Sequence, residues 1–344
     1  MFKRILRSKE IGIQFHMKRS ILYHLLIIFV TVCFATCEKP TDPVSESPVT
    51  REERIPDGAV KITPKADLFP PLLNVTGWNV PVPMPGPVNT SGGEDSPFIT
   101  PDGQTFFFFF TPDVQIPAEK QLLDGVTGIW WCQKSGDDWT EPKRIVLYDD
   151  LSLDGAPFFQ DPVLWFGSIR PENFGEIDVY TAQLESGKWT HIENAGAQLN
   201  QKYDIGEFHL TQDGMALYCG GAEKWGDFSG KDIYVLSKTD TGWTAPSALP
   251  APINTSEYNE DQPFISSDGN ELWFTGQSRQ GKPGPAVFRS TRQANGSWDD
   301  PVEVISQFAG EPTLDDAGNL YFVHHFFDSD MNMIEADIYV AYRQ

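Results

Sequence analysis

The pattern of apolar and polar residues along the chain repeats five times. Its clearest copy is EDQPFISSDGNELWFTG at 260–276, which predicts a short strand, a tight Asp-Gly turn and a second apolar strand. The other copies stand at 94–111, 154–168, 206–221 and 310–323. Aligned on Pro97, Pro157, Phe208, Pro263 and Pro312, successive copies are 60, 51, 55 and 49 residues apart. A period of this length is typical of propellers and solenoids.

Each copy predicts the same order of strands. A proline lies near the start of four first strands and cannot donate a hydrogen bond to a sheet, so these strands should lie at sheet edges. Asp-Gly turns at 102–103, 213–214 and 268–269 lead into the second strands. Third strands are expected at IWWCQ, DVYTAQ, DIYVLS, VFRSTR and DIYVAY, and outer strands beside Trp139, Trp189, Trp243 and Trp298.

The strands predict an all-β fold, a five-bladed β-propeller over residues 71–344. Strands such as Phe106–Phe110 are apolar on both faces, as expected for a blade packed between two others. The fifth copy has no outer strand of its own before Gln344, while GWNVPVPMPGPVNT at 77–90 matches GWTAPSALPAPINT at 242–255. We therefore expect the N-terminal strand to complete the last blade and close the ring, because closure removes exposed sheet edges.

The repeat contains W-x-x-P, N-T, E-D-x-P-F-I-S-x-D-G, L-W-F and D-I-Y in that order. This pattern resembles the TolB-like, or WD40-like, β-propeller repeats of bacterial envelope proteins, some of which also carry OmpA-like domains. The resemblance covers about 77–344 and implies a propeller fold. It does not indicate an activity, since the matching residues are those that build blades.

Residues 1–36 are expected to be a leader that is not part of the fold. Lys18 and Arg19 precede an apolar run at 20–36, and Met17 is an alternative start to Met1. Cys37 follows two small residues, which resembles a bacterial lipoprotein signal, although Phe34 departs from the usual aliphatic residue; an uncleaved anchor helix is the alternative.

Residues 37–70 are rich in Pro, Ser, Glu and Thr and are expected to be a flexible tether. These features predict an outer-membrane lipoprotein of the cell envelope, facing the periplasm or the cell surface.

Charge narrows the range of partners. The whole chain carries a net charge of −22, and without residues 1–36 it has 20 basic and 47 acidic residues, a net charge of −27. Such a surface repels nucleic acid. Cys132 and Cys219 lie in different repeats without C-x-x-C spacing, so we expect buried free thiols, and neither a metal nor a cofactor is predicted.

Acidic residues recur where the chain enters each first strand. Five blades would bring them around one channel mouth together with basic and aromatic residues of the middle loops. One interpretation is that each acid pairs with a neighbouring cation; the other is a polar funnel that binds a cation, a sugar or a peptide. The residues of this predicted funnel are Glu94, Asp95, Asp154, Arg170, Glu207, Lys224, Trp225, Glu260, Asp261, Arg279 and Glu311.

An enzyme is the alternative to a binding or scaffold module. Five-bladed propeller glycosidases of the arabinanase and β-xylosidase type place carboxylates from different blades over the channel, and the Asp95-Ser-Pro and Glu311-Pro contexts are similar to that family. The candidate catalytic residues on this hypothesis are Asp95, Glu207 and Glu311. Two carboxylates separated by an attacking water would give inversion at the sugar carbon.

Three further motifs suggest ligands but have simpler interpretations. Asp328, Asp330 and Asn332 alternate as in a calcium loop, yet the glycine of its sharp turn is missing, so a solvated acidic loop is expected. His324 and His325 are adjacent and should point to opposite faces of a strand. His209 stands where other copies have Phe98 or Phe264, and we expect a buried histidine rather than a ligand. We therefore predict a membrane-tethered binding or scaffold module whose partner is an envelope protein or a glycan.

Overall fold

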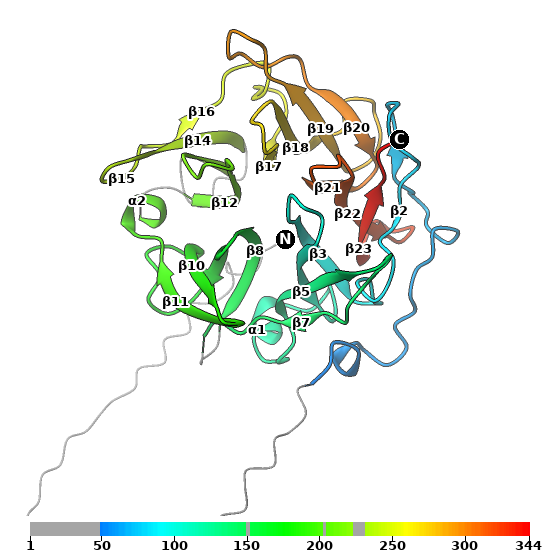
Figure 1. Ribbon diagram of the computed structural model, residues 1–344. Helices are drawn as coiled ribbons and strands as arrows, with labels where there is room; N and C mark the ends of the chain where they lie inside the picture. Colours follow the sequence, from blue (N-terminus) through cyan, green and yellow to red (C-terminus); the bar gives the residue numbers. More distant parts are fainter. Residues whose placement is uncertain (1–48, 149–151, 202–203, 223–230) are drawn as a thin grey trace, which may run out of the picture. The chain divides into compact units, whose positions relative to one another are not determined.

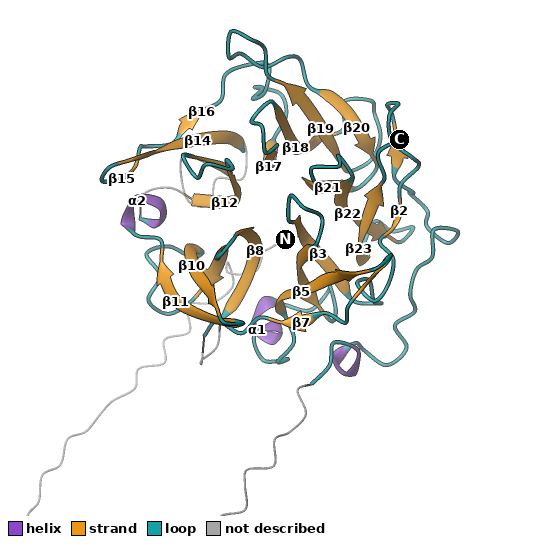
Figure 2. Ribbon diagram, viewed as in Figure 1, coloured by secondary structure: helices purple, strands orange, loops and turns teal. Residues whose placement is uncertain are grey.

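Antiparallel strands make up almost all of the regular structure of this protein (Figures 1 and 2). The computed structural model describes residues 49–148, 152–201, 204–222 and 231–344, and residues 50–344 form one compact unit. Its helical segments are a 3₁₀ turn at Glu52–Arg54 and the single-turn helices α1 (Ala118–Gln121) and α2 (Ala197–Asn200). The prediction of an all-β class is confirmed.

The strands fall into successive repeat units, and each unit follows the predicted order of first, second, third and outer strand. The first unit contains β3 (Gly93–Ile99), β4 (Thr105–Thr111), β5 (Gly128–Ser135), β6 (Asp138–Trp139) and β7 (Lys143–Arg144). The second contains β8 (Leu153–Gln160), β9 (Val163–Ile169), β10 (Asp178–Glu185) and β11 (Lys188–Asn194). The third contains β12 (Asp204–Leu210), β13 (Ala216–Ala222), β14 (Asp232–Thr239), β15 (Gly242–Trp243) and β16 (Ser247–Ala248).

The last two units recruit short strands from the N-terminal part of the chain. β17 (Glu260–Ile265), β18 (Glu271–Gln277), β19 (Pro285–Thr291) and β20 (Val302–Ser306) are extended by β1 (Leu72–Leu73). β21 (Ala309–Leu314), β22 (Leu320–Phe327) and β23 (Met333–Ala341) are extended by β2 (Val82–Pro83). Val82 lies opposite Val340, and the amide of Asn79 donates to the Tyr342 carbonyl at 2.9 Å.

The first strands contact one another in cyclic order: β3 with β8, β8 with β12, β12 with β17, β17 with β21, and β21 with β3. Figure 1 shows them gathered around one centre, with the third and outer strands farther out. A single parallel pairing, Ala336 with Gly93, joins β23 to β3, so these two units count as one sheet. β8, β12, β17 and β21 each end a sheet, as the prolines of three of them predict.

Every first strand carries a β-bulge near its proline or the equivalent residue. The pairing register shifts between Asp95 and Phe98, and equivalently at Gly155/Phe158, Asp261/Phe264 and Gly310/Thr313; in β12 it shifts one residue earlier, between Ile205 and Phe208. At four bulges the residue before the proline has a positive φ: Ser96 (46°), Ala156 (49°), Gln262 (54°) and Glu311 (54°). A residue before proline avoids the right-handed helical region, and a bulge re-aims the side chain.

The expected flexible tether over 37–70 is wrong for its second half. Arg51 is 2% exposed, Ile62 donates its backbone N–H to Glu335 at 3.0 Å, and Asp67 lies 2.8 Å from His324. Composition alone missed this because a few charged side chains, rather than an apolar stripe, attach the segment. The predicted leader, Cys37 and residues 38–48 lie outside the described residues. Among the residues described, no helix is both long and apolar enough to cross a bilayer.

Candidate functional site

Three acids of the predicted funnel lie in buried ion pairs. Glu94, Asp154 and Glu260 occupy the same position, three residues before the first-strand proline, and are 0%, 6% and 0% exposed. Their partners are Arg51 at 3.3 Å, Arg170 at 3.2 Å and Arg279 at 2.9 Å, respectively. The equivalent residues in β12 and β21 are the apolar Ile205 and Ala309. These acids and arginines therefore do not line an open funnel, and they hold the strands of each unit together.

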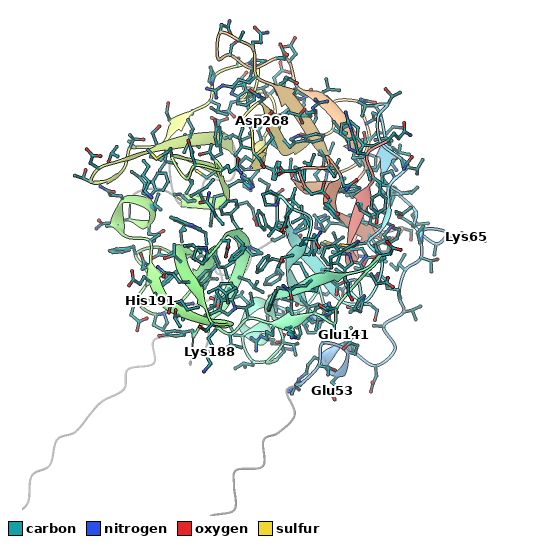
Figure 3. The ribbon with its side chains drawn as sticks, in the orientation of Figure 1. Glu53, Lys65, Glu141, Lys188, His191 and Asp268 are labelled. Carbon is teal, nitrogen blue, oxygen red and sulfur yellow. The ribbon has the colours of Figure 1, made fainter. Side chains whose placement is uncertain are left out.

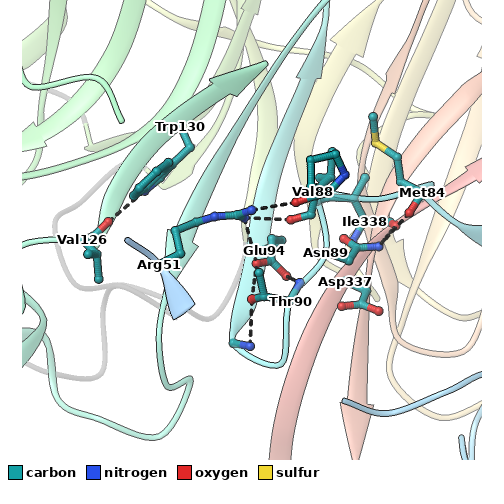
Figure 4. Close-up of polar contacts among 12 residues, drawn as sticks. Arg51, Met84, Val88, Asn89, Thr90, Glu94, Val126, Trp130, Asp337 and Ile338 are labelled. Atoms are coloured by element: carbon teal, nitrogen blue, oxygen red, sulfur yellow. Dashed lines mark hydrogen bonds and ion pairs between the residues drawn. The ribbon is translucent and has the colours of Figure 1, made fainter. Parts of the chain in front are cut away.

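Each arginine of these pairs packs against aromatic rings. Arg170 and Arg279 follow the second strands of their own units, and Arg170 lies 4.4 Å from the Tyr180 ring centre. Arg51 instead reaches the first unit from the N-terminal segment and lies 5.3 Å from the ring of Phe110. Figure 4 shows its guanidinium between Glu94 and Val88. The guanidinium donates to the carbonyls of Pro87 and Val88 at 2.7 and 2.8 Å. Burial raises the pKa of Glu94 to about 6, although the charge of Arg51 opposes this shift.

Asp261, another acid of the predicted funnel, is paired with Lys231. The predicted funnel residues Lys224 and Trp225 lie outside the described residues.

Asp95, Glu207 and Glu311 do come together, from three different first strands. Ser96 links them, because its hydroxyl donates to Glu207 at 3.3 Å and its backbone N–H donates to Glu311 at 2.8 Å. Gln262 also donates its side-chain amide to Glu311. We call Asp95, Glu207 and Glu311 the channel carboxylates. Glu207, Glu311 and Ser96 each stand one residue before the aligned Phe208, Pro312 and Pro97, within the bulged part of their strands, and Asp95 precedes Ser96.

The channel carboxylates affect one another's ionisation. Burial, followed by the charge of Asp95, raises the pKa of Glu207 to about 7. Burial and the charges of Asp95 and Glu207 also raise the pKa of Glu311 well above its ordinary value. A proton can therefore be held at this place near neutral pH, which is what general acid catalysis or a shared hydrogen bond between carboxyl groups requires.

The two adjacent histidines of β22 point to different surroundings, as strand alternation predicts. His324 is buried against Asp67 of the N-terminal segment. Nε2 of His325 lies 3.9 Å from Asp95, and burial lowers the pKa of His325 despite the neighbouring carboxylate. Among the described residues, no group of three or more His, Cys, Asp or Glu side chains is arranged to hold a metal ion.

Among the described residues, a small cavity adjoins two of the channel carboxylates. The cavity that Glu207 and Glu311 line has a volume of about 40 Å³ and is walled by the first-strand prolines. A buried water requires on the order of 10–15 Å³ of such volume, so this space fits a few waters and no sugar ring.

A cavity of about 460 Å³ lies at the other end of the first strands. Its rim comes from the turns that follow these strands and includes Asp102, Asp161 and Gln212. Its floor comes from four first strands, each of which contributes the residue that follows the proline or the equivalent Phe208. These residues are Phe98, Phe158, His209 and Phe264. The sequence analysis missed this cavity because it used charged residues as the signal for a site. The floor of the cavity is aromatic, and such residues are not distinguishable in sequence from residues of the hydrophobic core.

His209 lies between the two cavities and lines both of them. Its ring centre is 4.5 Å from those of Phe158 and Phe264 and 5.9 Å from that of Phe98. Nδ1 of His209 is buried and has no hydrogen-bond partner among the described residues. Burial lowers the pKa of His209 to about 3, and the imidazole is therefore neutral at physiological pH.

Comparison with known proteins adds an architectural likeness. No family model matches the chain, and no curated protein matches it in sequence. Among solved structures, TolB from Acinetobacter baumannii is 15% identical with a TM-score of 0.37; the match covers 61% of this chain and 48% of that one, about half its length. The catalytic domain of an α-L-arabinofuranosidase from Coprinopsis cinerea is 11% identical with a TM-score of 0.48, covering 76% of this chain and 95% of that one. At these identities the likenesses concern architecture and not activity.

Proposed function

We propose that this chain is a membrane-tethered binding module of the cell envelope, built as a five-bladed β-propeller of the TolB-like kind. Residues 1–36 are its leader, and a lipid on Cys37 anchors it in the outer membrane, facing the periplasm or the cell surface. Its partner is an envelope protein or a glycan, and nucleic acid is disfavoured by the net charge of −22.

Two features support five closed blades. The five first strands contact one another in cyclic order, and each begins a unit of antiparallel strands. β2 pairs with β23, and Gln344 donates its backbone N–H to the Gly77 carbonyl at 3.0 Å, which brings the C-terminal residue against the N-terminal strand. Such pairing covers a sheet edge that would otherwise be open.

The observation that carries the binding function is the 460 Å³ cavity at the turn end of the first strands. Ligand sites of proteins have volumes of roughly 300–1,000 Å³ and combine apolar walls with a few polar groups. Here an aromatic floor meets a rim of hydroxyl, amide and carboxylate groups. At the other end, Glu94, Asp154, Glu260 and Asp261 are paired, and the cavity that the described residues form beside Glu207 and Glu311 has a volume of only about 40 Å³.

Saturation-transfer NMR with a panel of monosaccharides, aromatic amines, aromatic acids, aromatic alcohols and short peptides tests this function. We expect at least one class to bind the full chain and to lose binding in Ser267→Trp, which places a bulky ring at the cavity rim. Gln212→Trp is a second block at an exposed position. Glu141→Gln is the control, because Glu141 is exposed and lies away from the centre (Figure 3). Absence of binding, or binding that survives both blocks, would contradict the proposal.

The anchor is tested separately. The full chain expressed in a bacterium should incorporate palmitate and partition with membranes, and Cys37→Ser should lose the label. Equal labelling of the substituted chain would show that Cys37 is not lipidated.

Glycoside hydrolysis is the second candidate, and the convergence of Asp95, Glu207 and Glu311 is what favours it. Glu207, with a pKa of about 7, has the proton affinity of a general acid. Against it stands the volume of only about 40 Å³ beside these groups. We expect no hydrolysis of arabino- and xylo-oligosaccharides by the full chain. Clear turnover that Asp95→Asn or Glu311→Gln abolishes at an unchanged melting temperature would favour the enzyme instead.

A further inference from the structure

The charged residues that line the large cavity are both carboxylates. They are Asp102 and Asp161, and both are exposed at the rim. The remaining lining residues are apolar, aromatic or neutral polar, apart from the imidazole of His209. An anionic ligand would therefore meet negative charge and no compensating cation in this cavity, whereas a cationic ligand meets favourable charge on entry.

The floor of the cavity also favours a cation. The rings of Phe98, Phe158 and Phe264 surround His209, and the negative face of an aromatic ring attracts a cation. A protonated histidine among these rings would repel such a ligand. The low pKa of His209 keeps it neutral, so this repulsion is absent at physiological pH.

The imidazole of His209 adds selectivity for an N–H group. A neutral imidazole has one acceptor nitrogen, and His209 lines the cavity. An ammonium group that carries N–H bonds can donate to an imidazole nitrogen, while a quaternary ammonium cannot. The volume of 460 Å³ leaves room for an apolar body attached to that ammonium.

We propose that the cavity binds a small organic ammonium ion with an apolar body, held by the aromatic floor, the imidazole of His209 and the carboxylates of Asp102 and Asp161. The proposal rests on the proposed binding function and adds a small-molecule ligand for the cavity beside the protein or glycan partner proposed for the whole module.

The test compares four probes of similar shape by isothermal titration with the full chain. They are phenethylamine, its N,N,N-trimethyl analogue, phenethyl alcohol and 3-phenylpropionate. We expect phenethylamine to bind about three- to tenfold more tightly than the alcohol, which lacks the charge, and the carboxylate to bind most weakly. Equal or tighter binding of the alcohol or the carboxylate would overturn the proposal. A fifth probe, Nα-acetyl-lysine amide, carries the ammonium of a lysine side chain, and tighter binding of this probe would also overturn the proposal, because the cavity would then suit a polypeptide side chain better than a small amine.

Two variants assign the contributions of single residues. His209→Phe introduces the phenylalanine that stands at the three other floor positions. It should lower the affinity for phenethylamine about threefold or more, while the affinity for the trimethyl analogue should stay nearly unchanged. Asp161→Asn should weaken both cations by roughly two- to fivefold at low salt and less at high salt. An equal loss for the two cations in His209→Phe would exclude the imidazole as acceptor.

The outcomes separate this inference from the function on which it rests. If another class of the panel binds and Ser267→Trp blocks it, while phenethylamine shows no preference, the binding function stands and the ammonium class fails. If no panel member binds, both fail. Melting temperatures of His209→Phe and Asp161→Asn, compared with Glu141→Gln, show whether a loss of affinity reflects unfolding.

Discussion

At the residue scale, position within the repeat decides what an acid does. Glu94 and Glu260, which stand three positions before the proline of their first strands, are buried beside arginines. Glu311 stands one position before its proline, and the bulge turns it toward Ser96 and Glu207. The sequence predicted that acids recur at the strand entry, and it named the three that converge. It could not separate the two positions, because the bulge that distinguishes them changes the face to which a side chain points and leaves the spacing almost unaltered.

Stability should depend on pH through Glu207. Its pKa in the folded chain, about 7, is raised above the ordinary value of 4.5, so the folded state binds more protons than the unfolded state between these values. The resulting stabilisation is complete below about pH 4.5 and is lost as the pH rises through 7. Glu207→Gln should therefore raise the free energy of unfolding at pH 8 by an amount on the order of 1–3 kcal/mol, which appears as a higher melting temperature. At pH 4.5 the same substitution should change the melting temperature little. An equal effect at both pH values would contradict the shift.

Removal of Arg51 should destabilise the chain through Glu94. Arg51→Met keeps much of the side-chain volume but leaves a buried carboxylate without its cation, which typically costs about 3–5 kcal/mol. Urea unfolding should show this loss, and the double variant Arg51→Met with Glu94→Gln should recover part of it, because no unpaired charge then remains. A single variant as stable as the wild type would mean that Arg51 contributes only packing.

At the scale of elements, strands and turns were the most predictable features. Asp-Gly turns, paired apolar runs and prolines at strand starts each have a local cause, and the observed strands follow them closely. The N-terminal segment was not predictable in the same way. Its contacts, such as Lys61 with Asp337 and Asp67 with His324, join residues more than 250 positions apart, and a stretch rich in Pro and Ser gives no local sign of them.

Deletion of residues 71–90 should unfold or aggregate the chain. It removes β1 and β2 and also Trp78, which is 5% exposed and packs edge-on against Trp273 at 5.7 Å. Losing this burial, at about 25 cal/mol per Å² of apolar surface, approaches the 5–15 kcal/mol that stabilises a domain. A chain that begins at Thr50 is the matched control and should melt as the full chain does. Identical melting of both truncations would contradict a closing role for β2.

At the scale of the whole molecule, the two ends of the central strands differ in chemistry. One end gathers the channel carboxylates in about 40 Å³ of space, and the other opens into a cavity of about 460 Å³ with an aromatic floor and an acidic rim. The first strands contribute residues to both ends. The sequence could not indicate the volume of either space, because no local pattern encodes how these strands converge.

A crystal structure of the chain soaked with its best-binding panel ligand tests the central claim most directly. The account predicts density for the ligand in the large cavity, against Phe98 and Phe264 and within reach of His209. Density beside Asp95, Glu207 and Glu311, with the large cavity empty, would contradict a binding module of this kind and would place the functional site at the channel carboxylates.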